Sequence, residues 1–267
     1  MSAIRSLLQT LCLTLLLLVP LGNSGRAATV PVIAAAADLQ FALAEIADRF
    51  AAATGQKVRL ALGSSGNFTH QIAQGAPFEL FLSADENYIF HLHDLGLTRD
   101  RGILYATGRV GLFVPHGSAL RGDPGLEDLH AALQDGRLKR FAIANPDHAP
   151  YGRAAREILN TAGLWEGITS RLVYGENAAQ ATQFAASGAS QGGVIPLSLA
   201  LAPQIAGLGE FFLLPQNWHS NEPLRQRMVL LTSAGATAGL FYDYLQQPEA
   251  RQIFVRYGFV MPEGTGD

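Results

Sequence analysis

The stretch GSSGNF, residues 63–68, stands between a run at 57–62 that predicts a β-strand and the run THQIAQGAP at 69–77, which predicts an α-helix. The start of a helix leaves backbone N–H groups free and carries a partial positive charge, so such a turn is typical of an anion site. Serine and asparagine are also preferred helix caps. By itself the turn fits two interpretations, a capped helix start and an anion-binding turn.

Strands and helices alternate on both sides of this turn. Residues 29–35 are apolar and predict a short buried strand, and residues 39–50 place their large apolar side chains at helical spacing. A third strand is expected at 78–83 and a helix after it. The repeated order of strand and helix predicts a parallel sheet with helices on both faces.

A second unit of the same α/β kind follows. It spans roughly 109–226, and the segment GRVGLFVP at 108–115 is a candidate to cross between the two units. The last strand and the helices after it have no partner of their own, so we expect them to return to the first unit. The sequence thus predicts a two-lobe α/β protein with mostly parallel sheets, lobe I from 29–108 plus 227–267 and lobe II from 109–226.

Four predicted helix starts carry the candidate ligand contacts. They are residues 36–38 and 63–66 in lobe I, and 150–152 and 176–178 in lobe II. Ligands of open α/β sheets bind where strands end and helices begin. We therefore expect the four helix starts to meet at one cleft between the lobes.

The beginning of the chain has the pattern of a secretory signal peptide, residues 1–28. An apolar run, Leu7–Val19, is followed by small residues that predict cleavage near Ala27 or Ala28. The single cysteine, Cys12, lies within this segment, so the mature protein is expected to have no disulfide and no thiol chemistry. These features predict a soluble, monomeric protein of the periplasm.

The net charge argues against polyanionic partners. The full chain has 19 Lys and Arg against 22 Asp and Glu, and loss of Arg5 and Arg26 leaves 17 against 22, a formal charge of −5. Such a balance attracts neither nucleic acid nor an acidic membrane surface. If the ligand is an anion, local dipoles must hold it.

Signals for catalysis, metals and cofactors are weak. The match GASQG at 188–192 has a helix before it and a strand after it, the reverse of a nucleophile elbow. His91 and His93 are two residues apart, which is poor metal-ligand spacing on a helix. We expect no catalytic residue, no bound metal and no cofactor, although a hydrolase built on Ser64, Ser65 or Ser190 stays open until a base is located.

The loop NPDHAPYG at 145–152 is rich in turn residues. Tyr151 lies between Pro150 and Gly152, where its hydroxyl is expected either to enter the cleft or to stay on the surface. His148 is a candidate ligand or proton carrier, and the alternative is a packing role within the loop.

Four stretches resemble the periplasmic molybdate-binding proteins of ABC importers, in the right order and over nearly the whole mature chain. The resemblance implies a two-lobe protein that closes over a tetrahedral oxyanion, molybdate or tungstate, held by backbone N–H groups and hydroxyls. It also implies delivery to an ABC permease in the inner membrane. The stretches are AAADLQFALAEIADRFAAATG, GSSGNFTHQIAQGAPFELFLSAD, NPDHAPYGRAAREIL and FYDYLQQPEARQIFVRYGF.

The resemblance also implies a set of ligand contacts. Ser65, with Ser64 beside it, would donate to an oxyanion oxygen, and Tyr151 stands at a contacting position of the second lobe. Asp38 and Ala178 would each offer a backbone N–H.

Two positions depart from the family pattern. Pro196 stands where some members place a contacting tyrosine and offers neither hydroxyl nor N–H, so Tyr151 is the candidate to replace that contact. Asp38 stands where serine or threonine is usual. We favour a helix cap for its side chain. The alternative is a carboxylate in the cleft, which would favour a protonated oxyanion such as phosphate or arsenate.

Overall fold

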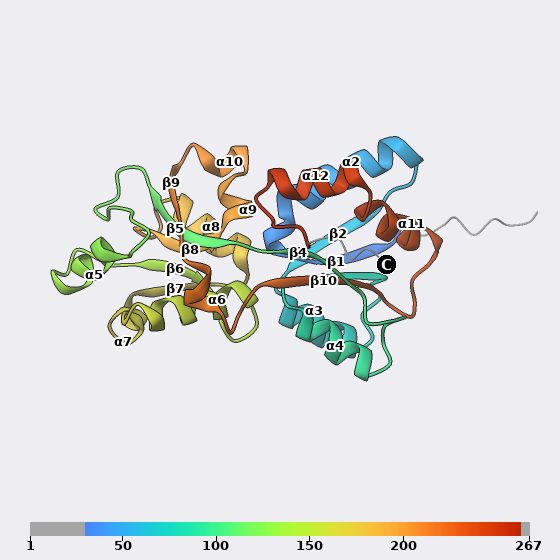
Figure 1. Ribbon diagram of the computed structural model, residues 1–267, viewed down its shortest axis with the longest axis horizontal. Helices are drawn as coiled ribbons and strands as arrows, with labels where there is room; N and C mark the ends of the chain where they lie inside the picture. The colour runs from blue at the N-terminus through green and yellow to red at the C-terminus, as the bar shows by residue number, and fades with distance from the viewer. Residues whose placement is uncertain (1–29, 263–267) are drawn as a thin grey trace, which may run out of the picture.

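Two five-stranded sheets, each covered by helices on both faces, make up the computed structural model, which describes residues 30–262 (Figure 1). The predicted signal peptide at 1–28 lies outside the described residues. None of the helices within 30–262 is long and apolar enough to cross a membrane.

The first sheet has the strand order β2-β1-β3-β10-β4. β1 pairs in parallel with β2 and β3, whereas β10 runs antiparallel to β3 and β4. Its strands are β1 (Val32–Ala36), β2 (Arg59–Gly63), β3 (Leu80–Ser83), β4 (Ile103–Thr107) and β10 (Arg225–Leu230). Its helices are the 3-10 turn η1 (Ala37–Leu39), α2 (Gln40–Thr54), α3 (Ser65–Ala73), α4 (Glu86–Asp94), α11 (Ala236–Leu245) and α12 (Pro248–Arg256).

The second sheet repeats the pattern with the order β7-β6-β8-β5-β9. β6 is parallel to β7 and β8, and β5 is antiparallel to β8 and β9. Its strands are β5 (Val110–Pro115), β6 (Phe141–Ala144), β7 (Leu172–Gly175), β8 (Gly193–Pro196) and β9 (Gly209–Leu213). The helices and 3-10 turns beside it are α5 (Glu127–Gln134), α6 (Pro150–Thr161), α7 (Trp165–Ile168), η2 (Thr169–Arg171), α8 (Ala178–Ala186), α9 (Leu197–Ala200), α10 (Pro203–Ala206) and η3 (Gln216–His219).

The predicted alternation of strand and helix is therefore found in both lobes, and each sheet is mixed. The antiparallel half of each sheet comes from the strands next to the points where the chain changes lobe. The chain passes from β4 to β5 through residues 108–109 and returns from β9 to β10 through 214–224. At the first passage, a Cβ on Gly108 would lie 2.1 Å from the Tyr151 hydroxyl, so only glycine fits there.

Lobe I is held by the apolar face of α2 packed against the sheet and the C-terminal helices. Leu39, Leu43, Ile46 and Phe50, the stripe expected from helical spacing, are all fully buried. The Phe50 ring meets Phe241 of α11 edge-on, with ring centroids 5.0 Å apart. This contact fixes the C-terminal helices to lobe I, so α2 and the turn η1 before it stand on a rigid base.

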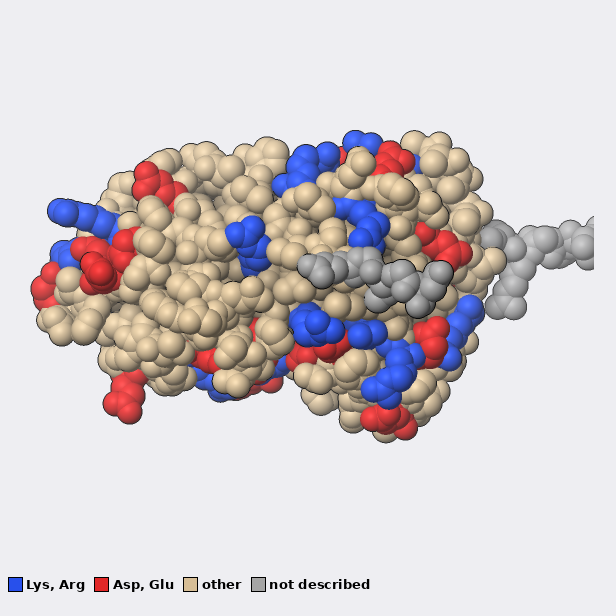
Figure 2. Space-filling view, in the orientation of Figure 1, with Lys and Arg blue, Asp and Glu red and all other residues tan. Residues whose placement is uncertain are grey.

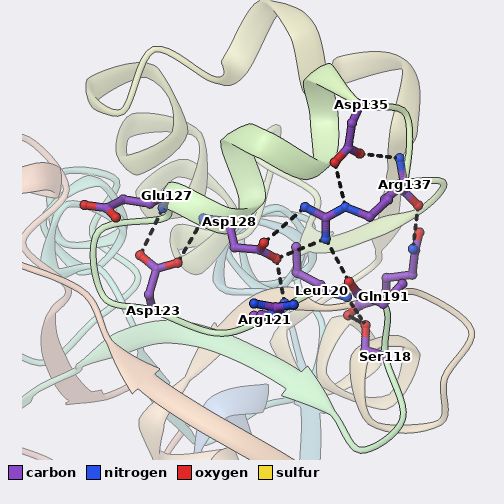
Figure 3. Close-up of polar contacts among 10 residues, drawn as sticks. Ser118, Leu120, Arg121, Asp123, Glu127, Asp128, Asp135, Arg137 and Gln191 are labelled. Carbon is purple, nitrogen blue, oxygen red and sulfur yellow. Dashed lines mark hydrogen bonds and ion pairs between the residues drawn. The ribbon is translucent and has the colours of Figure 1, made fainter.

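The end of lobe II around α5, a helix that was not predicted, is organised by a polar network. The Arg137 guanidinium bonds Asp128 and Asp135, and Asp123 accepts from the first backbone N–H groups of α5 (Figure 3). Gln191 donates to the Arg137 carbonyl and ties this network to the turn before β8. The bonds are local, which fits a structural role for this part of the lobe.

Candidate functional site

A small cavity lies between the lobes, where helix starts from both sheets meet. The predicted convergence of four helix starts is confirmed, because each of the four segments contributes to the lining. No Lys, Arg or His lines the cavity. Its lining residues are Ala36, Ala37, Asp38, Gly63, Ser64, Ser65, Ala84, Ala149, Pro150, Tyr151 and Ala178.

Ser65 is placed as a hydrogen-bond donor to whatever occupies the cavity. It is the first residue of α3 and is fully buried. Its Oγ accepts the backbone N–H of Ala84 at 3.0 Å, so the acceptor side of the hydroxyl is engaged from β3's end. The hydroxyl proton is left for the cavity, where an oxyanion oxygen would accept it.

Ser64 lines the same cavity but has other partners. It is the N-cap of α3, and its Oγ accepts the backbone N–H of Asn67 at 3.4 Å. His148 Nδ1 lies 2.9 Å from this oxygen, and His148 Nε2 lies 3.5 Å from Glu176 Oε2. These neighbours favour a proton on Nε2, so that Nδ1 accepts the Ser64 hydroxyl. The cap interpretation of the GSSG turn is therefore confirmed for Ser64, and Ser65 remains the candidate donor to an anion in the cavity.

The starts of the other helices leave further N–H groups free. α6 begins at Pro150, which has no N–H, and Gly152 N already donates to Ala149 O at 2.9 Å. The backbone N–H of Tyr151 is therefore the free donor in the first turn of this helix. In α8 the cap Asn177 accepts from Gln180 N at 3.0 Å. The N–H of Ala178, one residue after the cap, stays free to face the cavity.

Tyr151 is not a surface aromatic, because only 2% of it is exposed. It belongs to a buried cluster with Asp38, Tyr105 and Gln226. Gln226 Nε2 donates to Asp38 Oδ2 at 2.6 Å and to the Tyr151 hydroxyl at 3.3 Å, and Gln226 Oε1 accepts from the Tyr105 hydroxyl at 2.7 Å. Burial, and then the nearby Asp38 charge, raise the pKa of Tyr151 well above its ordinary value, so its hydroxyl stays a donor.

The Asp38 carboxyl is 1% exposed and is only half satisfied. While Oδ2 accepts from Gln226, Oδ1 accepts no hydrogen bond from the residues the structure describes. Burial raises the pKa of Asp38 to about 6, and the hydrogen bond from Gln226 acts in the opposite direction.

The expectation that Asp38 caps its helix is wrong. Asp38 lies inside the turn η1, whose N-cap is Ala36, and neither η1 nor α2 has a side-chain cap bond. The side chain is beyond the capping position and instead meets Gln226 of β10. Its backbone carbonyl accepts from Ser198 of lobe II at 2.8 Å, so this turn also joins the lobes. Pro196, as expected, does not line the cavity.

A second set of contacts joins the lobes beside the cavity. Arg153 of α6 forms an ion pair with Asp85, the N-cap of α4, donates to the Tyr88 hydroxyl at 2.9 Å and bonds both oxygens of Glu222 at 3.0 Å. We call Arg153, Asp85, Tyr88 and Glu222 the latch. Gly66 N donates to His148 O at 2.9 Å nearby.

The latch arginine and Gln226 were not predicted from the sequence. Arg153 follows the PYG turn by one residue, and a lone charge at a helix start has many surface explanations. Gln226 lies between two arginines, Arg225 and Arg227, and strand alternation could have placed it on the buried face. Within residues 30–262 no three His, Cys, Asp or Glu side chains come together as a metal site.

Comparisons with known proteins agree with this architecture. The chain is 36% identical to the molybdate-binding protein ModA of Azotobacter vinelandii over 243 residues, 90% of this chain and 92% of that protein. ModA of Rhodobacter capsulatus is also 36% identical, over 244 residues that are 90% of this chain and 92% of that one.

The solved periplasmic molybdate-binding protein of Azotobacter vinelandii superposes with a TM-score of 0.77 at 29% identity, covering 87% of this chain and all of that one. The sulfate-binding protein SubI of Mycobacterium tuberculosis has the same fold at 14% identity, with a TM-score of 0.67, covering 86% of this chain and 85% of that one. The fold is thus shared by binders of different anions. The pattern of bacterial extracellular solute-binding proteins matches residues 31–260. Because that match runs through both lobes and both passages between them, the chain belongs to the bacterial extracellular solute-binding protein family.

Proposed function

We propose that this protein captures molybdate or tungstate outside the cytoplasm and delivers it to an ABC permease. One observation carries the proposal: the interlobe cavity is lined by hydroxyls, by first-turn residues of helices and by the Asp38 carboxyl, and by no basic side chain. Uncharged donors in a rigid shell hold a dianion through local dipoles and select it by size. The relatives named above are molybdate-binding proteins.

The proposed contacts are the Ser65 hydroxyl, the Tyr151 hydroxyl and the backbone N–H groups of Asp38 and Ala178. Ser64 supports the site by fixing the start of α3 and by binding His148 of the opposite lobe. Charged side chains of both signs are scattered over the face shown in Figure 2, which fits attraction by local dipoles. The site needs no cofactor.

The test is a thermal-shift and calorimetry panel on the mature protein with molybdate, tungstate, sulfate and phosphate. Ligands that bind only the folded state raise the unfolding midpoint. We expect submicromolar binding of molybdate and tungstate and much weaker binding of sulfate. Sulfate as tight as molybdate would refute size selection.

The buried carboxyl of Asp38 favours one alternative, a ligand that carries its own proton, such as hydrogen phosphate or arsenate. In that case Oδ1 would accept a hydrogen bond from the ligand. Tighter binding of phosphate than of molybdate in the same panel would select this alternative.

The hydrolase alternative now has a candidate base, because His148 contacts both Ser64 and Glu176. Three features argue for a binding role. The ring nitrogen facing Ser64 is Nδ1 and not the Nε2 of serine-protease triads. The Ser64 oxygen is engaged as a cap, and the Glu176 side chain is 69% exposed. Turnover of ester substrates that is lost in Ser64→Ala would contradict the binding role.

Export is a further part of the proposal. We propose a monomeric periplasmic protein whose signal peptide is cleaved near Ala27 or Ala28. Mass spectrometry of periplasmic material should find a mature chain that starts near Ala28 or Thr29, and an intact Met1 in that pool would contradict cleavage.

A further inference from the structure

Asp38 places a carboxyl in the same cavity that is proposed to hold a dianion. The side chain is buried, lines the cavity and has one oxygen, Oδ1, without a partner among residues 30–262. Every other hydrogen-bonding side-chain group of the lining is a hydroxyl. A carboxylate and a dianion that share a small buried cavity repel each other strongly, because neither has solvent to screen its charge.

The surroundings of Asp38 supply no positive charge to relieve this repulsion. The groups that meet its carboxyl are Gln226 and Tyr151, with Tyr105 behind Gln226, and each remains uncharged. On the elements that carry these partners, Arg225 and Arg227 of β10 pair with Glu86, and Arg153 of α6 pairs with Asp85 and Glu222. The turn η1 also packs against α2, α8, α9 and β2, and of these four α8 and α9 carry no titratable side chain. His148 is engaged by Ser64 and Glu176. The titratable side chains on α2 and β2 are Glu45, Asp48, Arg49 and Arg59, of which Glu45 is partly exposed and the other three are exposed.

We propose that each oxyanion enters this site together with one proton, which lies between Asp38 Oδ1 and a ligand oxygen. This inference rests on the proposed function, because it takes a dianion as the ligand. The proton turns the carboxyl into a donor and adds one hydrogen bond to those from Ser65 and Tyr151. It also removes one negative charge from the closed cavity.

The bond pattern supports this arrangement. Gln226 Nε2 can only donate, so it holds Oδ2 as the acceptor oxygen and leaves Oδ1 as the oxygen that carries the proton. Burial already raises the pKa of this carboxyl to about 6 in the ligand-free protein. The negative charge of a bound dianion raises it further, so that in the complex the carboxyl keeps its proton through the pH range of the test.

The experiment is calorimetric titration of the wild-type mature protein with sodium molybdate at pH 7.5 in two buffers of different ionisation enthalpy. The difference in observed heat gives the number of protons taken up with the ligand. We expect close to one proton per molybdate. The affinity should also fall about tenfold for each unit of pH between about 7 and 8.5, the slope for one linked proton.

Asp38→Asn provides the first comparison, because the amide keeps the shape, accepts from Gln226 and donates without a titrating proton. In this variant the proton uptake and the pH slope should both disappear. The matched control is Asp48→Asn on the exposed face of α2, which removes the same charge from the surface and should keep the wild-type uptake and slope.

The outcomes separate the two proposals. Absence of molybdate binding in the wild type would refute the proposed function. Molybdate binding without proton uptake would refute only the present inference, and so would a slope that persists in Asp38→Asn. Phosphate that binds more tightly than molybdate, without proton uptake, would mean that the ligand brings its own proton and would overturn both.

Discussion

Replacing Asp38 by asparagine should stabilise the ligand-free protein at neutral pH and not at acidic pH. Burial raises the pKa of this carboxyl from 3.8 to about 6. The folded protein therefore binds more protons than the unfolded chain between about pH 4 and 6, and wild-type stability falls as pH rises through this window. Asparagine has no such proton to lose.

The magnitude follows from the gap between the two pKa values. About two pH units at about 1.36 kcal/mol each correspond to about 3 kcal/mol. Because pH 4 already lies slightly above 3.8, the stability of Asp38→Asn minus that of the wild type should be about 2.5 kcal/mol larger at pH 7.5 than at pH 4. For a chain of this size, this corresponds to a change of roughly 5–10 °C in the difference between their thermal midpoints.

The measurement is urea unfolding without ligand at several values of pH, followed by far-UV circular dichroism. Tryptophan fluorescence is less suitable, because Trp165 and Trp218 both lie outside lobe I, where Asp38 is found. Asp48→Asn controls for the loss of one negative charge at the surface. A stability difference that stays constant from pH 4 to 7.5 would refute the buried, ionisable Asp38 described here.

The other predictions concern ligand affinity, measured by calorimetry with molybdate. Ser65→Ala should weaken binding by roughly 1.5–3 kcal/mol, the range for a hydrogen bond to a charged group. Ser64→Ala should mainly lower the free energy of unfolding, by about 1 kcal/mol, because the helix cap is lost. Equal losses of affinity in the two variants would contradict their different roles. Tyr151→Phe should weaken binding by roughly 1.5–3 kcal/mol, and an unchanged dissociation constant would remove the hydroxyl from the site. Arg153→Met keeps the aliphatic stem but removes the latch, so dissociation should become faster while the order of anion preference stays the same. Asp85→Asn should act in the same direction and more weakly, because asparagine still caps α4; a changed anion order in either variant would place the latch in ligand selection.

Periodicity and turn chemistry predicted the parts of the fold that depend on local patterns. The stripe on α2 and the serines before α3 were recognisable because apolar spacing and caps are set by neighbours in the chain. The strand β9 was missed, since its pairing with β5 is a long-range contact and its sequence lacks strict alternation.

The position of the candidate site could be predicted from the sequence, but the hydrogen-bond partners of its residues could not. The rule that ligands bind where strands end and helices begin identified the four segments that meet at the cavity. The partners of Asp38 were not predictable, because Gln226 is 188 residues away and reaches it only through the return strand β10. The same distance in sequence explains why the favoured local solution, a helix cap, was wrong.

Gly66 has a consequence for how closely the two lobes approach. A Cβ at this position would lie 2.7 Å from the His148 carbonyl oxygen and 2.9 Å from the Tyr88 hydroxyl, closer than real Cβ atoms come. With only a hydrogen atom as its side chain, Gly66 lets the two lobes approach each other closely. A methyl group at this position would keep the lobes apart without replacing any donor to the ligand. The Gly66→Ala variant would then bind its ligand without full closure of the lobes. Transport by the permease with this variant would show whether the permease recognises the bound ligand or the closed conformation.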